Sequence, residues 1–201
     1  MIIGAKYKIA RRLGAPIFEK TQTQKYAQSE SKKSRNQKRK FQRTDYAVQH
    51  NEKQKARYTY IVGEKQFANY VKDAVAASGK TSDILFEKLE LRLDNVTYRM
   101  GISNSRSHAR QIVSHGHMMV NGRRVDIPSY KLKIGDIVSI RPASLSKPLF
   151  ANLDEKLADR KIPAWIAFDM KKKSAEIQGM PKMEHAELLF DLGAVVEFYS
   201  R

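Results

Sequence analysis

The stretch that most constrains the fold runs from residue 93 to residue 125, because it carries two helical patterns followed by a hairpin signal. On a helix covering 93–100, the i, i+3, i+7 spacing creates one apolar face, which consists of Leu93, Val96 and Met100. A second helix, with Ser103 or Asn104 as its N-cap, repeats this pattern with Ala109, Ile112 and Val113. The spacing therefore predicts two consecutive amphipathic helices, each with one face to bury.

The residues that follow predict a small sheet on which these helices pack. Gly116 ends the second helix, and the Asn-Gly pair at 121–122 is typical of a two-residue hairpin turn between short strands. A further turn at Gly135-Asp136 precedes an apolar strand over 137–140. We therefore expect an α+β fold, in which two helices packed on a small β-sheet are inserted into a mostly helical chain.

The Lys and Arg residues from position 92 to position 124 are all arginines, and they are Arg92, Arg99, Arg106, Arg110, Arg123 and Arg124. Arg92, Asn95 and Arg99 share the helical face away from the apolar stripe, and Arg106 and Arg110 stand one turn apart on the next helix. A guanidinium group offers a planar fork that can bind phosphate oxygens bidentately and stack on exposed bases, whereas an ammonium group orients an anion poorly. This pattern favours a nucleic-acid-binding face over a set of solvated surface charges.

The overall charge supports the same interpretation. The chain has 38 Lys and Arg residues against 21 Asp and Glu residues, a formal net charge of +17, which indicates a polyanionic partner. Residues 1–43 hold 13 of the basic residues and only two acids, Glu19 and Glu30, and the stretch 31–43 has no aliphatic side chain with which to fold by itself. We interpret 1–43 as a basic arm for nucleic acid, the alternative being a solvated tail.

The remaining residues predict helices. Thr44 can cap a helix that has Asp45 in its first turn, and a third helix begins at Thr81 or Ser82. Between them, a helix over 64–77 has one apolar face and is closed by Gly79. That face consists of Phe67, Tyr70, Val71, Ala74 and Val75.

The segment 149–201 begins with a helical pattern over 152–161, continues through Trp165, Ile166 and Phe168, and closes with a strand at "VVEFYS". We expect it to complete the first helical domain. The predicted organisation is thus a basic arm at 1–43, a discontinuous helical domain at 44–91 and 149–201, and an inserted RNA-binding domain at 92–148. The final strand is also a candidate protein interface, through Glu197, Phe198 and Tyr199.

Several classes of function have no support in the sequence. Cysteine is absent, which removes disulfides, thiolate nucleophiles and cysteine-bound zinc. The opening residues lack the apolar run of a secretory signal, and no stretch approaches the roughly 20 apolar residues of a membrane span. No phosphate-binding glycine loop and no Gly-x-Ser-x-Gly motif occurs. We therefore predict neither an enzyme, nor a cofactor, nor a membrane partner.

The histidines at 108, 115 and 117 could suggest a metal site. No carboxylate or thiolate lies between Asp94 and Asp126 to complete one, so we predict no metal. His115 and His117 are better interpreted as donors to phosphate or as cations near a helix C-terminus.

The segment "RLDNVTYRMGISNSRSHARQIVSHGHMMVNGRRVDIPSYKLKIGDIVSI" resembles the S4 RNA-binding domain. Its flanks, "GAKYKIARRLG", "DYAVQHNEKQKARYTYIVGEKQFANYVKDA" and the closing "VVEFYS", are similar to the bacterial-type S4 family of small-subunit ribosomal proteins. The family's "PGQHG" segment is replaced by "KSRNQ" at 33–37. Some relatives hold a cysteine-bound zinc in the arm, which this chain, having no cysteine, cannot do.

The resemblance implies a structural constituent of the small ribosomal subunit that is a primary binder of 16S-type ribosomal RNA and nucleates subunit assembly. It implies a place near the site where messenger RNA enters, contacts with neighbouring small-subunit proteins, an influence on translational accuracy, and a cytoplasmic or organellar ribosome. Residues implied or expected to bind RNA in the inserted domain are Arg92, Asn95, Arg99, Arg106, Ser107, Arg110, Gln111, His115, His117, Asn121, Gly122 and Arg123. In the arm and the next helix they are Lys6, Lys8, Arg11, Arg12, Lys32, Lys33, Arg35, Lys38, Arg39, Lys40, Arg43, Lys53 and Arg57, with Arg39, Lys40 and Arg43 closest to the messenger RNA.

Two alternatives remain open from the sequence. Pseudouridine synthases that carry the same domain have a catalytic aspartate in an Arg-Leu-Asp segment, and residues 92–94 read "RLD". Against this, no glycine precedes Arg92 and no catalytic domain is left to house Asp94. The second alternative is a translational regulator that binds messenger RNA with the same module.

Overall fold

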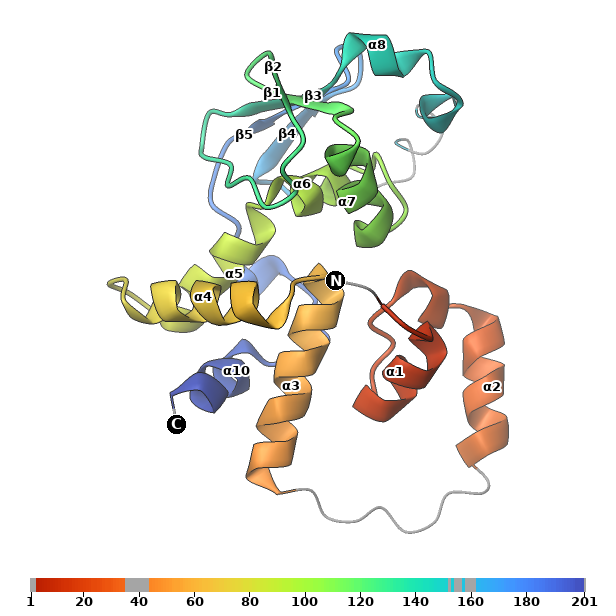
Figure 1. The fold of residues 1–201 in the computed structure, drawn as a ribbon, viewed down its shortest axis with the longest axis vertical. Helices are drawn as coiled ribbons and strands as arrows, with labels where there is room; N and C mark the ends of the chain where they lie inside the picture. The colour runs from red at the N-terminus through yellow and green to blue at the C-terminus, as the bar shows by residue number, and fades with distance from the viewer. Residues whose placement is uncertain (1–2, 35–43, 152, 154–156, 158–161, 201) are drawn as a thin grey trace. The chain divides into compact units, whose positions relative to one another are not determined.

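The computed structural model describes residues 3–34, 44–151, 153, 157 and 162–200, and the chain divides into two compact units. Unit 1 comprises residues 1–85 and 185–201, and unit 2 comprises residues 86–184. The division falls within helix α5 (Thr81–Glu90), so the insertion of one unit into the other is an observed feature. Figure 1 shows the elements of each unit.

The first part of unit 1 is a small helical assembly. Helices α1 (Lys6–Leu13) and α2 (Gln24–Ser34) flank a 3₁₀ helix at Glu19–Thr21. Their apolar side chains form a separate cluster, whose buried members are Ala10, Leu13, Ile17, Phe18 and Tyr26. The described portion of the predicted basic arm is therefore folded, because these apolar residues are numerous enough to bury one another.

Helices α3 (Asp45–Tyr60), α4 (Glu64–Val75) and α10 (Leu192–Tyr199), with the first residues of α5, make up the rest of the helical structure of unit 1. The Thr44 hydroxyl accepts a hydrogen bond from the Ala47 amide, which confirms the predicted N-cap. Helix α4 ends at Val75, before the predicted stop at Gly79, and it buries Phe67 while leaving Val75 exposed. All three helices predicted after the arm thus begin at the expected residues, since α5 begins at Thr81.

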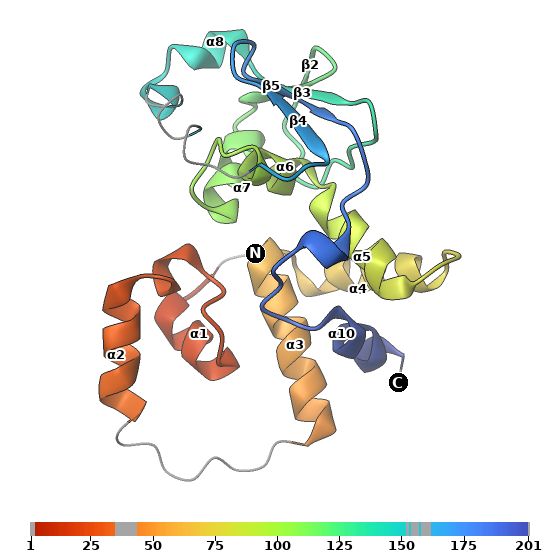
Figure 2. The ribbon, with the colours of Figure 1, turned by 180° about the vertical axis from the view of Figure 1, so that it is seen from behind.

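The predicted strand at the end of the chain is wrong, because α10 is a helix. The Asp191 carboxylate accepts a hydrogen bond from the Gly193 amide at 2.7 Å and caps the helix N-terminus. Leu192 and Val195 are buried, and the helix lies beside α3 in both views (Figures 1 and 2). Packing against α3 therefore overrides the strand preference of the two adjacent valines.

In unit 2, helices α6 (Leu93–Arg99) and α7 (Arg106–Ser114) pack on an antiparallel sheet, as predicted. The cap of α7 is Ser105, one residue beyond the predicted candidates; its hydroxyl accepts from the His108 amide at 3.2 Å. Strands β1 (Met118–Val120) and β2 (Arg123–Val125) form the predicted hairpin. Asn121 and Gly122 both have positive φ, as the tight turn between right-twisted strands requires.

The sheet has five strands in the order β2-β1-β3-β5-β4, and β3 spans Ile137–Ile140 as predicted. Strands β4 (Ile166–Asp169) and β5 (Ser174–Ile177) come from the segment that we assigned to the helical domain. That assignment is wrong for residues 149–184, because β5 pairs with β3 through Val138 opposite Ala175. The helix expected over 152–161 lies mostly outside the described residues.

The core of unit 2 lies between its helices and one face of the sheet. Val96 of α6 and Ile112 of α7 belong to the same buried cluster as Met118, Val138 and Ile177 of the strands. Short connections carry the chain around this core, among them α8 (Pro142–Leu145) and 3₁₀ helices at Pro148–Phe150 and Met183–His185. Among the helices of the described residues, none combines the length and apolar character that crossing a bilayer requires.

Candidate nucleic-acid interface

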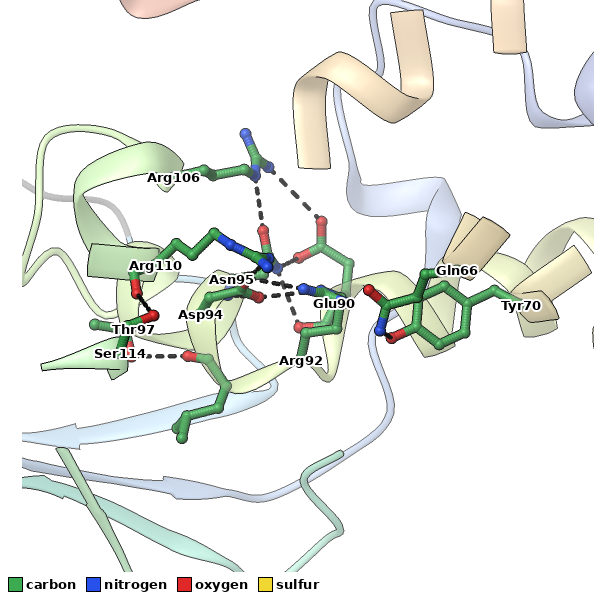
Figure 3. Close-up of polar contacts among 11 residues, drawn as sticks. Gln66, Tyr70, Glu90, Arg92, Asp94, Asn95, Thr97, Arg106, Arg110 and Ser114 are labelled. Carbon is green, nitrogen blue, oxygen red and sulfur yellow. Dashed lines mark hydrogen bonds and ion pairs between the residues drawn. The ribbon is translucent and has the colours of Figure 1, made fainter. Parts of the chain in front are cut away.

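Four arginines of unit 2 gather around two buried carboxylates, and we call this group the arginine cluster. Its acids are Glu90, the last residue of α5, and Asp94, in the first turn of α6. Its arginines are Arg92, Arg99, Arg106 and Arg110. Three helices and the link between two of them thus supply one group of charges, and Figure 3 labels its members other than Arg99.

Glu90 is the carboxylate that contacts Arg99 and Arg106, and it is 1% exposed. Its two carboxylate oxygens accept from Nε and Nη2 of Arg99, at 2.8 and 2.7 Å. The side-chain amide of Asn95 also donates to the Glu90 carboxylate, at 2.9 Å, and Arg106 Nη2 lies 3.9 Å from that carboxylate. The side-chain Oδ1 of Asn95 in turn accepts from Arg106 Nε at 2.7 Å, so Glu90 acts on Arg106 directly and through Asn95.

Asp94 is the carboxylate that contacts Arg92 and Arg110. Its oxygens accept from Nε and Nη2 of Arg92, at 3.0 and 2.8 Å, and the second oxygen also accepts from Arg110 Nη1 at 3.2 Å. The Asn95 backbone amide completes the set at 2.9 Å. In Figure 3, Arg106 and Arg110 extend from α7 toward these partners on α6 and at the end of α5.

The arginines differ in how much they reach solvent. The Arg92 side chain is 1% exposed, whereas the side chains of Arg99, Arg106 and Arg110 are 27%, 15% and 31% exposed. Arg106 also stacks over the Tyr98 ring at 4.6 Å. Four guanidinium groups share two carboxylates, so the cluster keeps an excess of two positive charges beside a partly exposed surface. Such an arrangement attracts and orients an anion.

A second group of cations lies after α7. Gly116 has a φ of 71°, and the Arg124 guanidinium lies so close to it that an added Cβ would collide with that group. His117 is 8% exposed, and its Nδ1 lies 2.9 Å from the Ser144 hydroxyl. Burial lowers the pKa of His117, and the nearby charges of Lys147, His115, Arg124 and Arg141 lower it further. These last four residues are positive or titratable and exposed.

The cations that we predicted on α3 belong to a network within unit 1. Lys53 lies 3.0 Å from Glu64 and 4.3 Å from the Phe198 ring centre, and Arg57 also pairs with Glu64, at 2.6 Å. The Tyr199 hydroxyl donates to Glu64 at 2.7 Å. Burial raises the pKa of Glu64, but the hydrogen bonds from Tyr199 and Lys53 and the nearby charges outweigh it, so the pKa is lowered overall. This network joins α10 to α3 and α4.

Comparison with known proteins decides the family. The model of the ribosomal protein S4/S9 N-terminal domain matches residues 2–90, and the S4 domain model matches residues 91–138. The chain is 41% identical to small ribosomal subunit protein uS4 of Chlorobaculum tepidum, over 98% of each chain. The chain belongs to the uS4 family. The uS4 proteins of Persephonella marina and Roseiflexus castenholzii are 40% and 42% identical to it, over at least 98% of each chain.

The structure brings part of the predicted uS4 site together. The predicted residues of unit 2 that reach solvent around α7 and the hairpin are Arg99, Arg106, Ser107, Arg110, Gln111, His115, Asn121, Gly122 and Arg123. Asn121 at the hairpin turn also donates to Asp136 at 2.8 Å. These residues remain candidates for RNA contact.

Four predicted RNA-binding residues are buried within the chain, and their contact with RNA stays a prediction. Arg92 and Asn95 are 1% and 2% exposed, because Asp94 and Glu90 draw them into the protein. Lys53 and His117 are 6% and 8% exposed, and each is engaged inside its own unit. The face of α6 that we expected to be free is therefore largely occupied by the chain's own carboxylates.

The remaining predicted RNA-binding residues of unit 1 differ in exposure and in internal contacts. Lys8 and Arg12 are exposed, Lys6 contacts the Phe18 ring, and Arg11 pairs with Glu30 at 2.6 Å. Two further lysines have described backbones only, and they are Lys32 and Lys33. Five others lie outside the described residues, and they are Arg35, Lys38, Arg39, Lys40 and Arg43. The candidate protein-interface residues all make internal contacts: Glu197 with Gln49, Phe198 with Tyr46 and His50, and Tyr199 with Glu64.

Sequence reasoning missed Glu90 altogether. It lies just before the arginine-only window, so a count of charges between 92 and 124 leaves it out. No local signal could have found it, because Glu90 lies nine residues before Arg99 and sixteen before Arg106, whereas helical spacing pairs residues only three or four apart. Tyr98, on which Arg106 stacks, was also missed.

Proposed function

We propose that this chain is a structural, non-enzymatic constituent of the small ribosomal subunit that binds small-subunit ribosomal RNA. The observation that carries the proposal is similarity along 98% of both chains to proteins named small ribosomal subunit protein uS4. The formal net charge of +17 and the charge excess of the arginine cluster support an RNA partner.

The proposed contacts follow from the exposed chemistry of unit 2. Arg99, Arg106 and Arg110 present partly exposed guanidinium groups whose positions are fixed by neighbours, and they bind phosphate oxygens. The exposed residues Gln111, His115 and Arg123 extend this surface along α7 and the β1–β2 hairpin. Because RNA helices are recognised largely through shape and backbone, such a surface binds a folded RNA rather than a short sequence.

The finer parts of the proposal rest on the family alone. As a uS4 protein, the chain binds ribosomal RNA early, nucleates subunit assembly, contacts neighbouring small-subunit proteins, and lies close to where messenger RNA enters, influencing accuracy. It acts in the cytoplasm as part of the ribosome, or in an organelle's ribosome. The exposed aromatic residue Tyr46 beside Phe198 on α10 supports a protein contact at that end of unit 1.

The alternative of an RNA-modifying enzyme finds little support in the geometry of Asp94. Both of its oxygens accept hydrogen bonds from arginines, and the residue is 4% exposed. A catalytic carboxylate must reach its substrate, and this one is enclosed by its own chain. The test of this alternative is the Asp94→Asn variant. If base modification persists in a cell extract that contains this variant, Asp94 is not a catalytic residue.

The test is binding of the full chain to isolated bacterial 16S ribosomal RNA over a range of salt concentrations. We expect the logarithm of affinity to fall linearly with the logarithm of salt, with a slope of about −0.7 to −0.9 per phosphate contacted. Arg106→Ala with Arg110→Ala should weaken binding by roughly tenfold or more. Lys171→Ala with Lys172→Ala, on the exposed β4–β5 turn, is the matched control for the loss of two charges.

Two outcomes would contradict the proposal. One is affinity that does not change between low and moderate salt. The other is absence of the protein from small ribosomal subunits when a cell lysate is sedimented, since a structural constituent must be present in stoichiometric amount.

A further inference from the structure

The two buried carboxylates of the arginine cluster, Glu90 and Asp94, need an explanation, because a carboxylate repels the phosphates of the RNA that the cluster is proposed to bind. We propose that Glu90 and Asp94 are positioning residues for RNA binding, which act by fixing the guanidinium groups of Arg99, Arg106 and Arg110. The inference rests on the proposed function and deepens it, because it gives a task to two acids that are buried within the chain. Glu90 is 1% and Asp94 4% exposed.

The first argument is the geometry of the hydrogen bonds. Glu90 binds Arg99 through both carboxylate oxygens, at 2.8 and 2.7 Å, which fixes the plane of that guanidinium as well as its position. Asp94 binds Arg110 at 3.2 Å while its other contacts hold it against the backbone of Asn95. An arginine held in this way loses less conformational freedom when it binds a phosphate.

The second argument is that the acids bring together residues from different elements. Glu90 ends α5, Arg99 ends α6, and Arg106 begins α7. Without the carboxylates, the guanidinium groups of two adjacent helices would repel one another and extend separately into solvent. The acids cancel this repulsion at close range, and the remaining excess of two positive charges is still available to RNA.

The third argument is that charge alone and positioning predict opposite results. Removing a negative charge from an RNA-binding protein strengthens its attraction for RNA if only the long-range field matters. Removing Glu90 weakens binding if its task is to hold Arg99 and Arg106. The sign of the change therefore separates the two explanations.

The experiment compares the full chain with Glu90→Gln in binding to 16S ribosomal RNA at several salt concentrations. We expect affinity to fall at least fivefold although the net charge rises by one. We also expect the salt slope to become shallower by about 0.7 to 0.9 for each phosphate that the variant no longer binds. Glu176→Gln is the matched control, because Glu176 is exposed on β5 and makes no ion pair among the described residues. Its affinity should equal or slightly exceed that of the wild type.

A double-mutant cycle shows whether Glu90 acts through its arginine. In an Arg99→Ala background, Glu90→Gln should cause less than half of the loss that it causes alone. Trp165 fluorescence and circular dichroism verify that the variants are folded. If Glu90→Gln does not fold, Glu90→Asp keeps the charge but draws the carboxylate back from Arg106, and it should bind more weakly with a shallower slope.

Each result either supports or overturns the inference. A folded Glu90→Gln or Glu90→Asp that binds as tightly as the wild type overturns it. A weaker variant whose slope is unchanged, or whose loss is undiminished in the Arg99→Ala background, also overturns it, since that describes general damage. These results are distinct from failure of the proposed function, which appears as a wild type that does not bind 16S ribosomal RNA.

Discussion

Replacing Asp94 by Asn should strongly destabilise unit 2, because it leaves a buried arginine without its counter-charge. Arg92 is 1% exposed and its guanidinium makes two hydrogen bonds to Asp94, at 3.0 and 2.8 Å. An Asn side chain keeps the shape but supplies only one acceptor and no charge. Breaking a buried ion pair from one side costs about 3–5 kcal/mol of the free energy of unfolding.

The measurement is urea unfolding followed by the fluorescence of Trp165, which is the only tryptophan of the chain and packs against the core of unit 2. Asp126→Asn is the matched control, since Asp126 is exposed and lies 3.9 Å from Arg124, and it should cost less than about 0.5 kcal/mol. Adding Arg92→Met to Asp94→Asn should recover part of the loss, because the buried charge that Asp94 had neutralised is then gone. A cost below about 1 kcal/mol for Asp94→Asn would refute the reasoning, since the pair would then be effectively solvated.

Three further predictions concern the same unit and can be followed by Trp165 fluorescence during urea unfolding. Met118→Ala should lower the free energy of unfolding by about 2–5 kcal/mol, because the Met118 side chain is fully buried. A change near zero would contradict the observed core. Gly122→Ala should lower the free energy of unfolding by about 1–2 kcal/mol from its φ of 77° alone, since its Cβ meets open space. Gly116→Ala should lower it by a similar amount, since the group that its Cβ meets is the movable end of the exposed Arg124 side chain. Because the pKa of His117 is lowered in the folded state, the unfolded chain binds a proton at this residue at a higher pH than the folded chain does. The stabilising contribution of neutral His117 is therefore present above about pH 6.5 and is lost as the pH falls toward the folded pKa. His117→Asn should flatten this decline, and an unchanged decline would contradict the assignment.

Much of unit 2 could be predicted because its signals are local. The apolar spacing of Leu93, Val96 and Met100 produces a helix with one buried face, and all three are 0% exposed. The Asn-Gly pair produces a tight hairpin because both residues tolerate positive φ. Such preferences act over a few residues, so they are readable in the printed order of the chain.

The candidate site was only partly predictable. Counting arginines and their helical spacing located Arg99, Arg106 and Arg110 correctly on adjacent helices. It did not indicate that Arg92 and Asn95 are buried, because the spacing of a helix says which residues share a face and not what covers that face. Glu90 covers it, and its distance from Arg106 in the sequence gives no sign of their proximity.

The sequence by itself determined the basic character, the amphipathic helices and the hairpin of this uS4 chain, since these depend on composition and on neighbours within one or two turns. Only the tertiary structure decided that β4 and β5 extend the sheet of unit 2, that the chain ends in a helix, and that two acids hold the arginines. The physical reason is that these features arise from contacts between residues far apart in the chain. In such contacts, the burial gained against a specific partner outweighs the local preference of either segment.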